Sequence, residues 1–119
     1  MNHSDGARCA LLPTLLLALL LPATSLSADV EAGKAVYDAN CAVCHGASGA
    51  GDGPVAKRGF PPPPSLITGK SAKMKDGQLF HIMTLGQGSM PPFASQMTPS
   101  QRWDTVNYVR SLQPQPDLS

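Results

Sequence analysis

Residues 40–46 read Asn-Cys-Ala-Val-Cys-His-Gly (NCAVCHG), and the interpretation of the whole chain depends on them. The stretch places two thiols, Cys41 and Cys44, three positions apart and puts the imidazole of His45 directly after the second thiol. Such a group suits a redox-active disulfide, one half of a zinc site, or a covalent anchor for haem. These chemistries belong to different proteins, so the surrounding sequence has to decide among them.

The surroundings argue against zinc and against thiol–disulfide exchange. A structural zinc site usually takes a second Cys or His pair, but after His45 the chain has only one more histidine, His81. A redox pair of the thioredoxin type starts a helix that follows a strand, whereas these thiols end a predicted helix over 29–41. Cys-x-x-Cys-His is the attachment signature of c-type haem. We therefore predict one haem c, bound through Cys41 and Cys44 with the adjacent imidazole on the iron; a simple disulfide is the remaining alternative.

The first 28 residues have the pattern of a secretory signal peptide. One basic residue, Arg8, precedes an uninterrupted apolar run at 15–21, and small residues follow it. The run is much shorter than the roughly 20 residues of a membrane-spanning helix. We expect cleavage after Ala28 or one residue earlier, an exported or periplasmic location, and one domain over 29–119. An uncleaved membrane anchor is the competing interpretation.

The composition describes a small domain with a thin core. The 119 residues carry a net formal charge of +1, so no strong overall charge favours a nucleic acid or a membrane surface as the partner. Aromatic residues make up 5% of the chain, which also contains 12 prolines and 11 glycines. Small domains of this kind usually need a metal, a disulfide or a bound group to stabilise them.

Helix signals appear in three segments, and the fold class we predict is all-α with long loops. The first segment is 29–41 and the second is about 76–85, which has an apolar stripe and a glycine after it. The third begins with a capping box, because Thr98 is a good N-cap, Pro99 suits the first helical position, and Gln101 lies three residues after the cap.

Met90 is the predicted second axial ligand of the iron. It stands in a glycine-rich loop before two prolines, where helix packing does not require a thioether and the backbone is held in place. The other candidates have simpler explanations. Met83 lies on the apolar stripe of the second helix, Met74 and Met97 suit the surface or small gaps in the core, and His81 suits an exposed or partly buried helical position.

From about Gly33 to Leu112, the chain resembles the monohaem class I cytochromes c. The resemblance is carried by Gly33-x-x-x-Tyr37, Cys41-Ala-Val-Cys44-His45, Met90-Pro91, and Trp103 with Tyr108-Val109. It implies a small all-α fold wrapped round one haem, in which the first and last helices cross with Gly33 against Tyr108.

The same resemblance implies a further haem-binding residue. The carbonyl of a proline after the motif is expected to accept a hydrogen bond from the ring N–H of His45, which would fix the tautomer of the ligand. We assign this role to Pro54, with the proline run 61–64 as the alternative. Leu66, at the end of the same loop, is included among the residues that contact the haem.

Two longer segments are similar to the monohaem cytochrome c subunit of alternative complex III, a quinol-oxidising membrane complex. They are CAVCHGASGAGDGPVAKRGFPPPPSL at 41–66 and GQGSMPPFASQ at 86–96. That subunit is often lipid-anchored, and here the chain departs from it, because no suitably placed cysteine follows the leader.

Ligation by His45 and Met90 would leave no open position on the iron, which predicts a single-electron carrier and not an enzyme. Its partners would be redox proteins of a respiratory or related chain: a quinol-oxidising complex, a terminal oxidase or another cytochrome. The alternatives are a peroxidase-like enzyme or gas sensor with a five-coordinate haem, and a haem-stabilised docking subunit. A basic cluster, either a guide for an acidic partner or a solvated rim, consists of Lys57, Arg58, Lys70, Lys73 and Lys75.

Overall fold

The computed structural model describes residues 26–115, and its helices follow one another in the order α1 (Leu26–Asn40), α2 (Ala42–His45), η1 (Pro54–Arg58), α3 (Gly69–Lys73), α4 (Asp76–Leu85) and α5 (Pro99–Leu112). Between residues 26 and 115 there is no strand, only an isolated bridge between Gln87 and Met90. The predicted all-α class is confirmed. The predicted leader, apart from its last three residues, lies outside the described residues.

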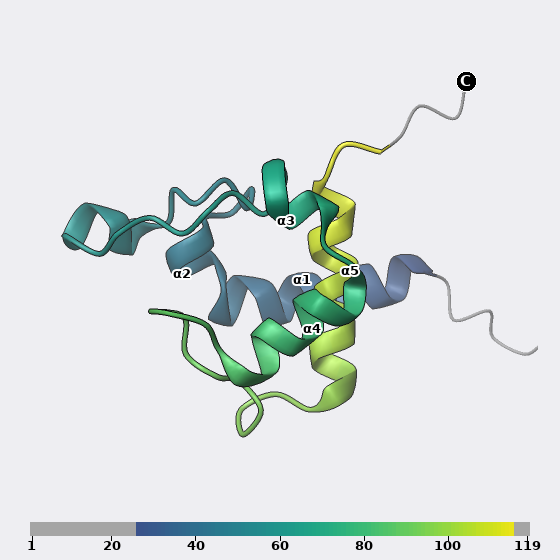
Figure 1. Cartoon of the computed structure of the whole chain (residues 1–119). Coiled ribbons are helices and arrows are strands. Elements are labelled where there is room, and N and C mark those ends of the chain that lie inside the picture. The colour runs from purple at the N-terminus through teal and green to yellow at the C-terminus, as the bar shows by residue number, and fades with distance from the viewer. Residues whose placement is uncertain (1–25, 116–119) are drawn as a thin grey trace, which may run out of the picture.

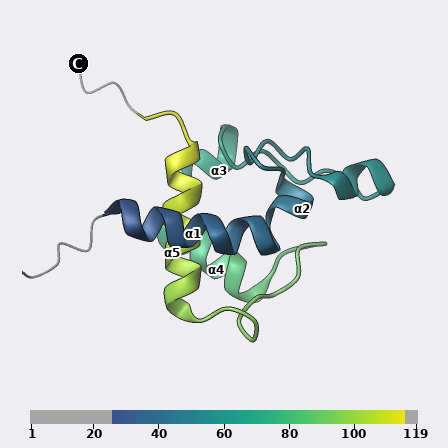
Figure 2. The same ribbon diagram turned by 180° about the vertical axis from the view of Figure 1, so that it is seen from behind.

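The central contact of the fold is the crossing of α1 and α5, which both views show (Figures 1 and 2). The helices approach so closely because Gly33 has no side chain: a Cβ at this position would lie 1.9 Å from the carbonyl oxygen of Asp104 and 3.0 Å from Cβ of Tyr108. Beside the crossing, the ring of Tyr37 is fully buried, and its centroid lies 5.1 Å from that of Tyr108. The predicted contact between Gly33 and Tyr108 is confirmed.

The start of α5 is fixed by the capping box that the sequence predicts. The backbone N–H of Gln101 donates to the Thr98 hydroxyl at 3.2 Å, and the backbone N–H of Thr98 donates to the Gln101 side chain at 2.9 Å. Both bonds satisfy amides that would otherwise lack partners at the helix start. The helix then buries Val106 and Val109 in two adjoining core clusters.

Arg110 near the end of α5 holds the segment that joins α3 to α4. Its Nε donates to Oδ1 of Asp76 at 2.7 Å, and its Nη atoms donate to the backbone carbonyls of Ala72 and Met74. Asp76 is 60% exposed, so the ion pair itself contributes little. The carbonyl bonds are the more important part, because they fix the backbone around Met74.

None of the helices within residues 26–115 is both long enough and apolar enough to span a membrane.

Candidate haem site

The thiol pair lies where α1 passes into the short helix α2. The backbone N–H of Cys41 donates to the carbonyl of Tyr37 at 2.8 Å, and the carbonyl of Cys41 accepts from the backbone N–H of His45 at 2.9 Å. The two helices therefore follow each other without a loop, and the motif is one helical turn. Both thiols are free; Cys41 is buried and Cys44 is half-buried. Burial, and to a smaller extent the nearby Cys44, raises the pKa of the Cys41 thiol to about 12.

The chain leaves the motif through a fixed turn. The hydroxyl of Tyr37 donates to the carbonyl of Gly46 at 2.6 Å, and this bond is buried. Burial raises the pKa of Tyr37, so the hydroxyl keeps the proton that it donates. Gly46 has φ of +79°, and a Cβ there would lie 1.9 Å from Oδ1 of Asp52. The backbone after the motif is thus tied to α1 on one side and to the following loop on the other.

His45 has the protonation state that a metal ligand needs. Burial lowers the pKa of its imidazole, which favours the neutral ring with a lone pair available. Its Nδ1 is buried and has no hydrogen-bond partner among the residues that the structure describes. A buried ring nitrogen of this kind calls for a partner, and a haem-bound imidazole normally has one on the nitrogen that does not face the iron.

Both proline candidates for that partner are connected to the region of the motif through a glycine. Gly53, directly before Pro54, donates its N–H to the carbonyl of Cys44 at 3.2 Å, and a Cβ on Gly53 would lie 2.4 Å from the carbonyl oxygen of Val43. The proline run is also near, because a Cβ at Gly51 would lie 2.3 Å from the carbonyl oxygen of Pro63. Neither carbonyl is bonded to Nδ1 here, so the role of Pro54 remains a prediction.

Leu66 packs against the core cluster that contains Cys41. It is half-buried there, and the cluster is formed by Tyr37, Cys41, Tyr108 and Val109. Its backbone N–H donates to the carbonyl of Gly49 at 2.8 Å, so the long loop closes on itself at this residue. This position suits the predicted haem contact, which the structure does not test.

Met90 ends a tight turn that is anchored to α4. Its backbone N–H donates to the carbonyl of Gln87 at 2.9 Å, and its carbonyl accepts from the N–H of Gln87 at 3.1 Å. Gly86 makes the turn possible, because it has φ of +74° and a Cβ there would lie 2.5 Å from the carbonyl oxygen of Met90. Beyond the turn, the N–H of Phe93 donates to the carbonyl of Met83 at 3.0 Å. The half-buried Met90 thus has a well-defined backbone position.

The other candidate ligands occupy varied places. Met83 and Met97 are buried together with Phe93 and Val106, so core packing explains both. His81 is exposed on α4. Met74, which we expected at the surface or in a small gap, is half-buried and lines a pocket. The pattern around it could not reveal this, since its position depends on Arg110, 36 residues away.

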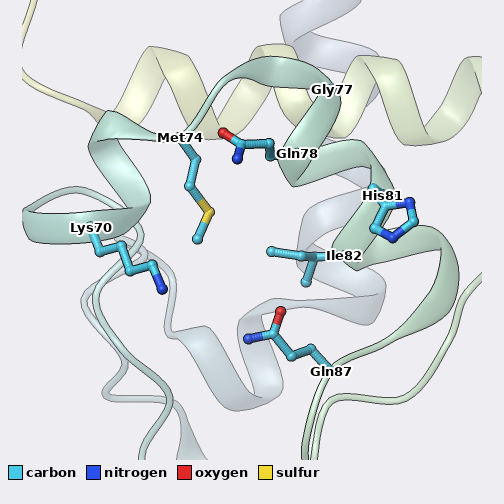
Figure 3. Close-up of a pocket in the computed structure, with 7 residues that line it drawn as sticks. All are labelled: Lys70, Met74, Gly77, Gln78, His81, Ile82 and Gln87. Carbon is cyan, nitrogen blue, oxygen red and sulfur yellow. The ribbon is translucent and has the colours of Figure 1, made fainter.

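The pocket has a volume of about 520 Å³ and is lined by Lys70, Met74, Gly77, Gln78, His81, Ile82 and Gln87. Figure 3 shows the side chains of Met74, Ile82 and Gln87 directed into it from different segments of the chain. Gln87 is also the first residue of the turn that ends at Met90. The pocket therefore adjoins the segment that carries the predicted second ligand.

These residues fit a covalently bound haem. The chain offers two free thiols in one helical turn, a neutral imidazole directly after them, a thioether in a fixed turn, and a pocket beside that turn. Cysteine, histidine and methionine are the side chains that hold haem c and its iron.

Comparison with known proteins identifies the family of the chain. The model of the family described as cytochrome c oxidase, cbb3-type, subunit III matches residues 28–109. A cytochrome c-553-like protein of Synechocystis sp. is 34% identical over 89 residues, which cover 74% of this chain and 73% of that protein. Cytochrome c6 of Bumilleriopsis filiformis is 32% identical over 89 residues, covering 71% of this chain and 92% of the relative. The cbb3-type oxidase subunit FixP of Sinorhizobium medicae is 34% identical over 91 residues, but these make up only 30% of FixP.

Solved structures give the same result for the fold. A chain of the reducing HAO-like protein complex of Kuenenia stuttgartiensis superposes with a TM-score of 0.64 at 34% identity, over 73% of this chain and 44% of that chain. The c-type cytochrome KustC0563 superposes with a TM-score of 0.59 at 23% identity, over 69% of this chain and 98% of the other. The resemblance to monohaem class I cytochromes is confirmed, while the narrower one to the alternative complex III subunit remains a prediction. The chain belongs to the cytochrome c family that the cbb3-type model describes, and it is an electron carrier with covalently bound haem c.

Proposed function

We propose that the chain is a one-electron relay whose iron is held by His45 on one face and by Met90 on the other. The observation that carries the proposal is the anchored turn Gln87–Met90, which fixes the backbone that bears the thioether, and Gln87 of this turn lines the pocket. The segment after α4 extends to the same side of the molecule as α2, the helix that bears His45 (Figures 1 and 2). A ligand from each segment would fill both axial positions.

Bound haem supplies an iron that gains or loses one electron. The residues of the chain determine how it does so. Burial keeps His45 neutral, so its lone pair is free for the metal. Met90 packs against the apolar cluster of Met83, Phe93, Met97 and Val106. This contact keeps water away from one side of the Met90 side chain. A thioether ligand in a dry setting favours the reduced iron and raises the reduction potential.

Replacing Met90 by alanine tests the proposed ligand. The oxidised protein should lose the weak far-red absorption band that marks a methionine–iron bond. Its reduction potential should fall by an amount on the order of 100 mV, within the roughly 0.8 V over which axial ligands set haem potentials. Met83→Leu is the matched control, because it removes a buried thioether and keeps the volume. A band that survives in Met90→Ala and disappears in another methionine variant would transfer the role to that methionine.

An iron with both axial positions occupied by protein ligands predicts a second result, which distinguishes a carrier from an enzyme or gas sensor. The reduced wild-type protein should not bind carbon monoxide at neutral pH, and the Met90→Ala protein should bind it stoichiometrically, because the substitution opens an axial position. Absorption spectra before and after addition of the gas measure both. Stoichiometric binding by the wild type, or appreciable turnover of peroxide, would favour the five-coordinate alternative.

The location and the partners are further parts of the proposal. The apolar leader supports export, cleavage after Ala28 and a periplasmic domain over residues 29–119. Electrons would come from a quinol-oxidising complex and pass to a terminal oxidase or another cytochrome. The similarity to FixP, named as an oxidase subunit, supports a place in or beside such a complex. Purification of the native protein, with identification of the proteins that accompany it, distinguishes a free carrier from a subunit.

A further inference from the structure

A long excursion between α2 and α3 carries an exposed aromatic residue. The excursion runs out from the body of the molecule and returns, with η1 at its far end (Figures 1 and 2). Phe60, just after η1, is 60% exposed. Lys57 and Arg58, in the last turn of η1, are also exposed. We call these three residues the basic tip.

The base of the excursion is firmly attached to the fold. Leu66 donates its backbone N–H to the carbonyl of Gly49 at 2.8 Å, and Gly53 donates to the carbonyl of Cys44 at 3.2 Å. The outward and returning segments of the excursion touch where Gly51 lies against the carbonyl of Pro63. Consecutive prolines stiffen the returning part. The basic tip is therefore presented by a preorganised support, which reduces the entropy that binding would cost.

The charge around the tip has one sign. No acidic residue occurs between Asp52 and Asp76, while this interval holds five basic residues: Lys57, Arg58, Lys70, Lys73 and Lys75. Neither Lys57 nor Arg58 forms an ion pair among the described residues. The positive charges are thus available to a negatively charged surface.

We propose that the basic tip is a docking element for an acidic redox protein, with Phe60 seated in an apolar recess of that partner. Phenylalanine and arginine are both enriched at protein interfaces, and unpaired positive charges accelerate the approach of an acidic surface. A membrane is the weaker candidate, because one aromatic and two charges at the tip are few for stable anchoring. The base of the excursion is bonded through Gly53 to the backbone of Cys44, so the tip is supported directly by the segment that carries the haem motif.

This inference rests on the proposed relay function, and one experiment tests them separately. The full-length holoprotein is reduced, and its oxidation by membranes of the source organism is followed at several protein concentrations and ionic strengths. The variants are Phe60→Ala and the double variant Lys57→Gln with Arg58→Gln. The matched controls are Leu85→Ala, an equally exposed apolar residue, and Lys34→Gln, an exposed cation on α1.

We expect Phe60→Ala to raise KM about tenfold, equivalent to about 1.4 kcal/mol, with kcat and the haem spectrum unchanged. The double charge variant should also raise KM and should flatten the dependence on salt, because screening acts on the charges that it removes. Both controls should keep the wild-type values. Wild-type KM in Phe60→Ala would overturn the inference and leave the relay intact. A wild-type protein that the membranes do not oxidise would overturn both.

A flotation assay with phosphatidylglycerol vesicles, free of other proteins, decides between a protein and a lipid partner. The holoprotein should remain in the unbound fraction at physiological ionic strength. Flotation of the wild type that is lost in Phe60→Ala would assign the tip to the membrane surface and overturn the protein partner.

Discussion

Serine in place of both Cys41 and Cys44 is expected to abolish the attachment of haem to the polypeptide. The two thiols lie in one helical turn and are free, and a thioether at each would hold the porphyrin against the motif. Serine keeps the size and polarity of the side chain but cannot form the thioether. Denaturing electrophoresis followed by haem staining should give a stained wild-type band and an unstained band for the double variant.

Single replacements sharpen this test. Cys41→Ser and Cys44→Ser should each retain weaker stain, since one thioether remains possible. Met97→Leu is a suitable control because Met97 is buried in the core cluster away from the thiols. The expression host must be competent to attach haem c. A wild-type band without stain from such cells, or undiminished stain in the double variant, would contradict the covalent attachment.

The second large effect concerns stability, and it comes from Gly33. In Gly33→Ala the new methyl group would lie 1.9 Å from the carbonyl oxygen of Asp104, which belongs to the backbone of α5 and cannot rotate away. The two helices must move apart, and this movement disrupts the packing of the Tyr37 ring on the Tyr108 ring. We expect a loss of about 3 kcal/mol, at the upper end for overpacked cores, and a fall in Tm of roughly 12–24 °C.

Gly77→Ala is the matched control for this prediction. It is the same substitution in a helix, but nothing lies within 4 Å of the added Cβ. It should change stability little or increase it by up to about 1 kcal/mol, because alanine has the higher helix propensity. Thermal unfolding of each holoprotein, followed by circular dichroism, compares the two variants. Similar Tm values would show that the crossing of α1 and α5 is more adaptable than its geometry implies.

Local signals predicted the long helices well. The apolar stripe and the following Gly86 bounded α4 correctly, and the capping box of Thr98 located the start of α5. The helix α1 begins three residues earlier than predicted. The short helices α2, η1 and α3 were missed, because four or five residues are too few to show a helical period.

Parts of the site were beyond the reach of sequence patterns for a different reason. The Cys-x-x-Cys-His motif and Met90 can be recognised because residues adjacent in the sequence identify them. The place of Met74 depends instead on Arg110, and the burial of Arg102 depends on the carbonyl of Met97, to which its guanidinium donates at 2.8 Å. A charged residue is expected in solvent unless its partners are known. Trp103 is 43% exposed, and its ring stacks on Phe80 of another helix.

The burial of Cys41 has a consequence for the order of events during biosynthesis. Cys41 is 8% exposed, and its burial also raises the pKa of the thiol, which disfavours the reactive thiolate. A haem vinyl group therefore has little access to this sulfur once the chain has folded. We expect haem attachment to reach Cys41 while the chain is still open, before Tyr37 and Tyr108 pack into the same cluster with it. In this protein, haem attachment at Cys41 should therefore come before α1 packs on α5.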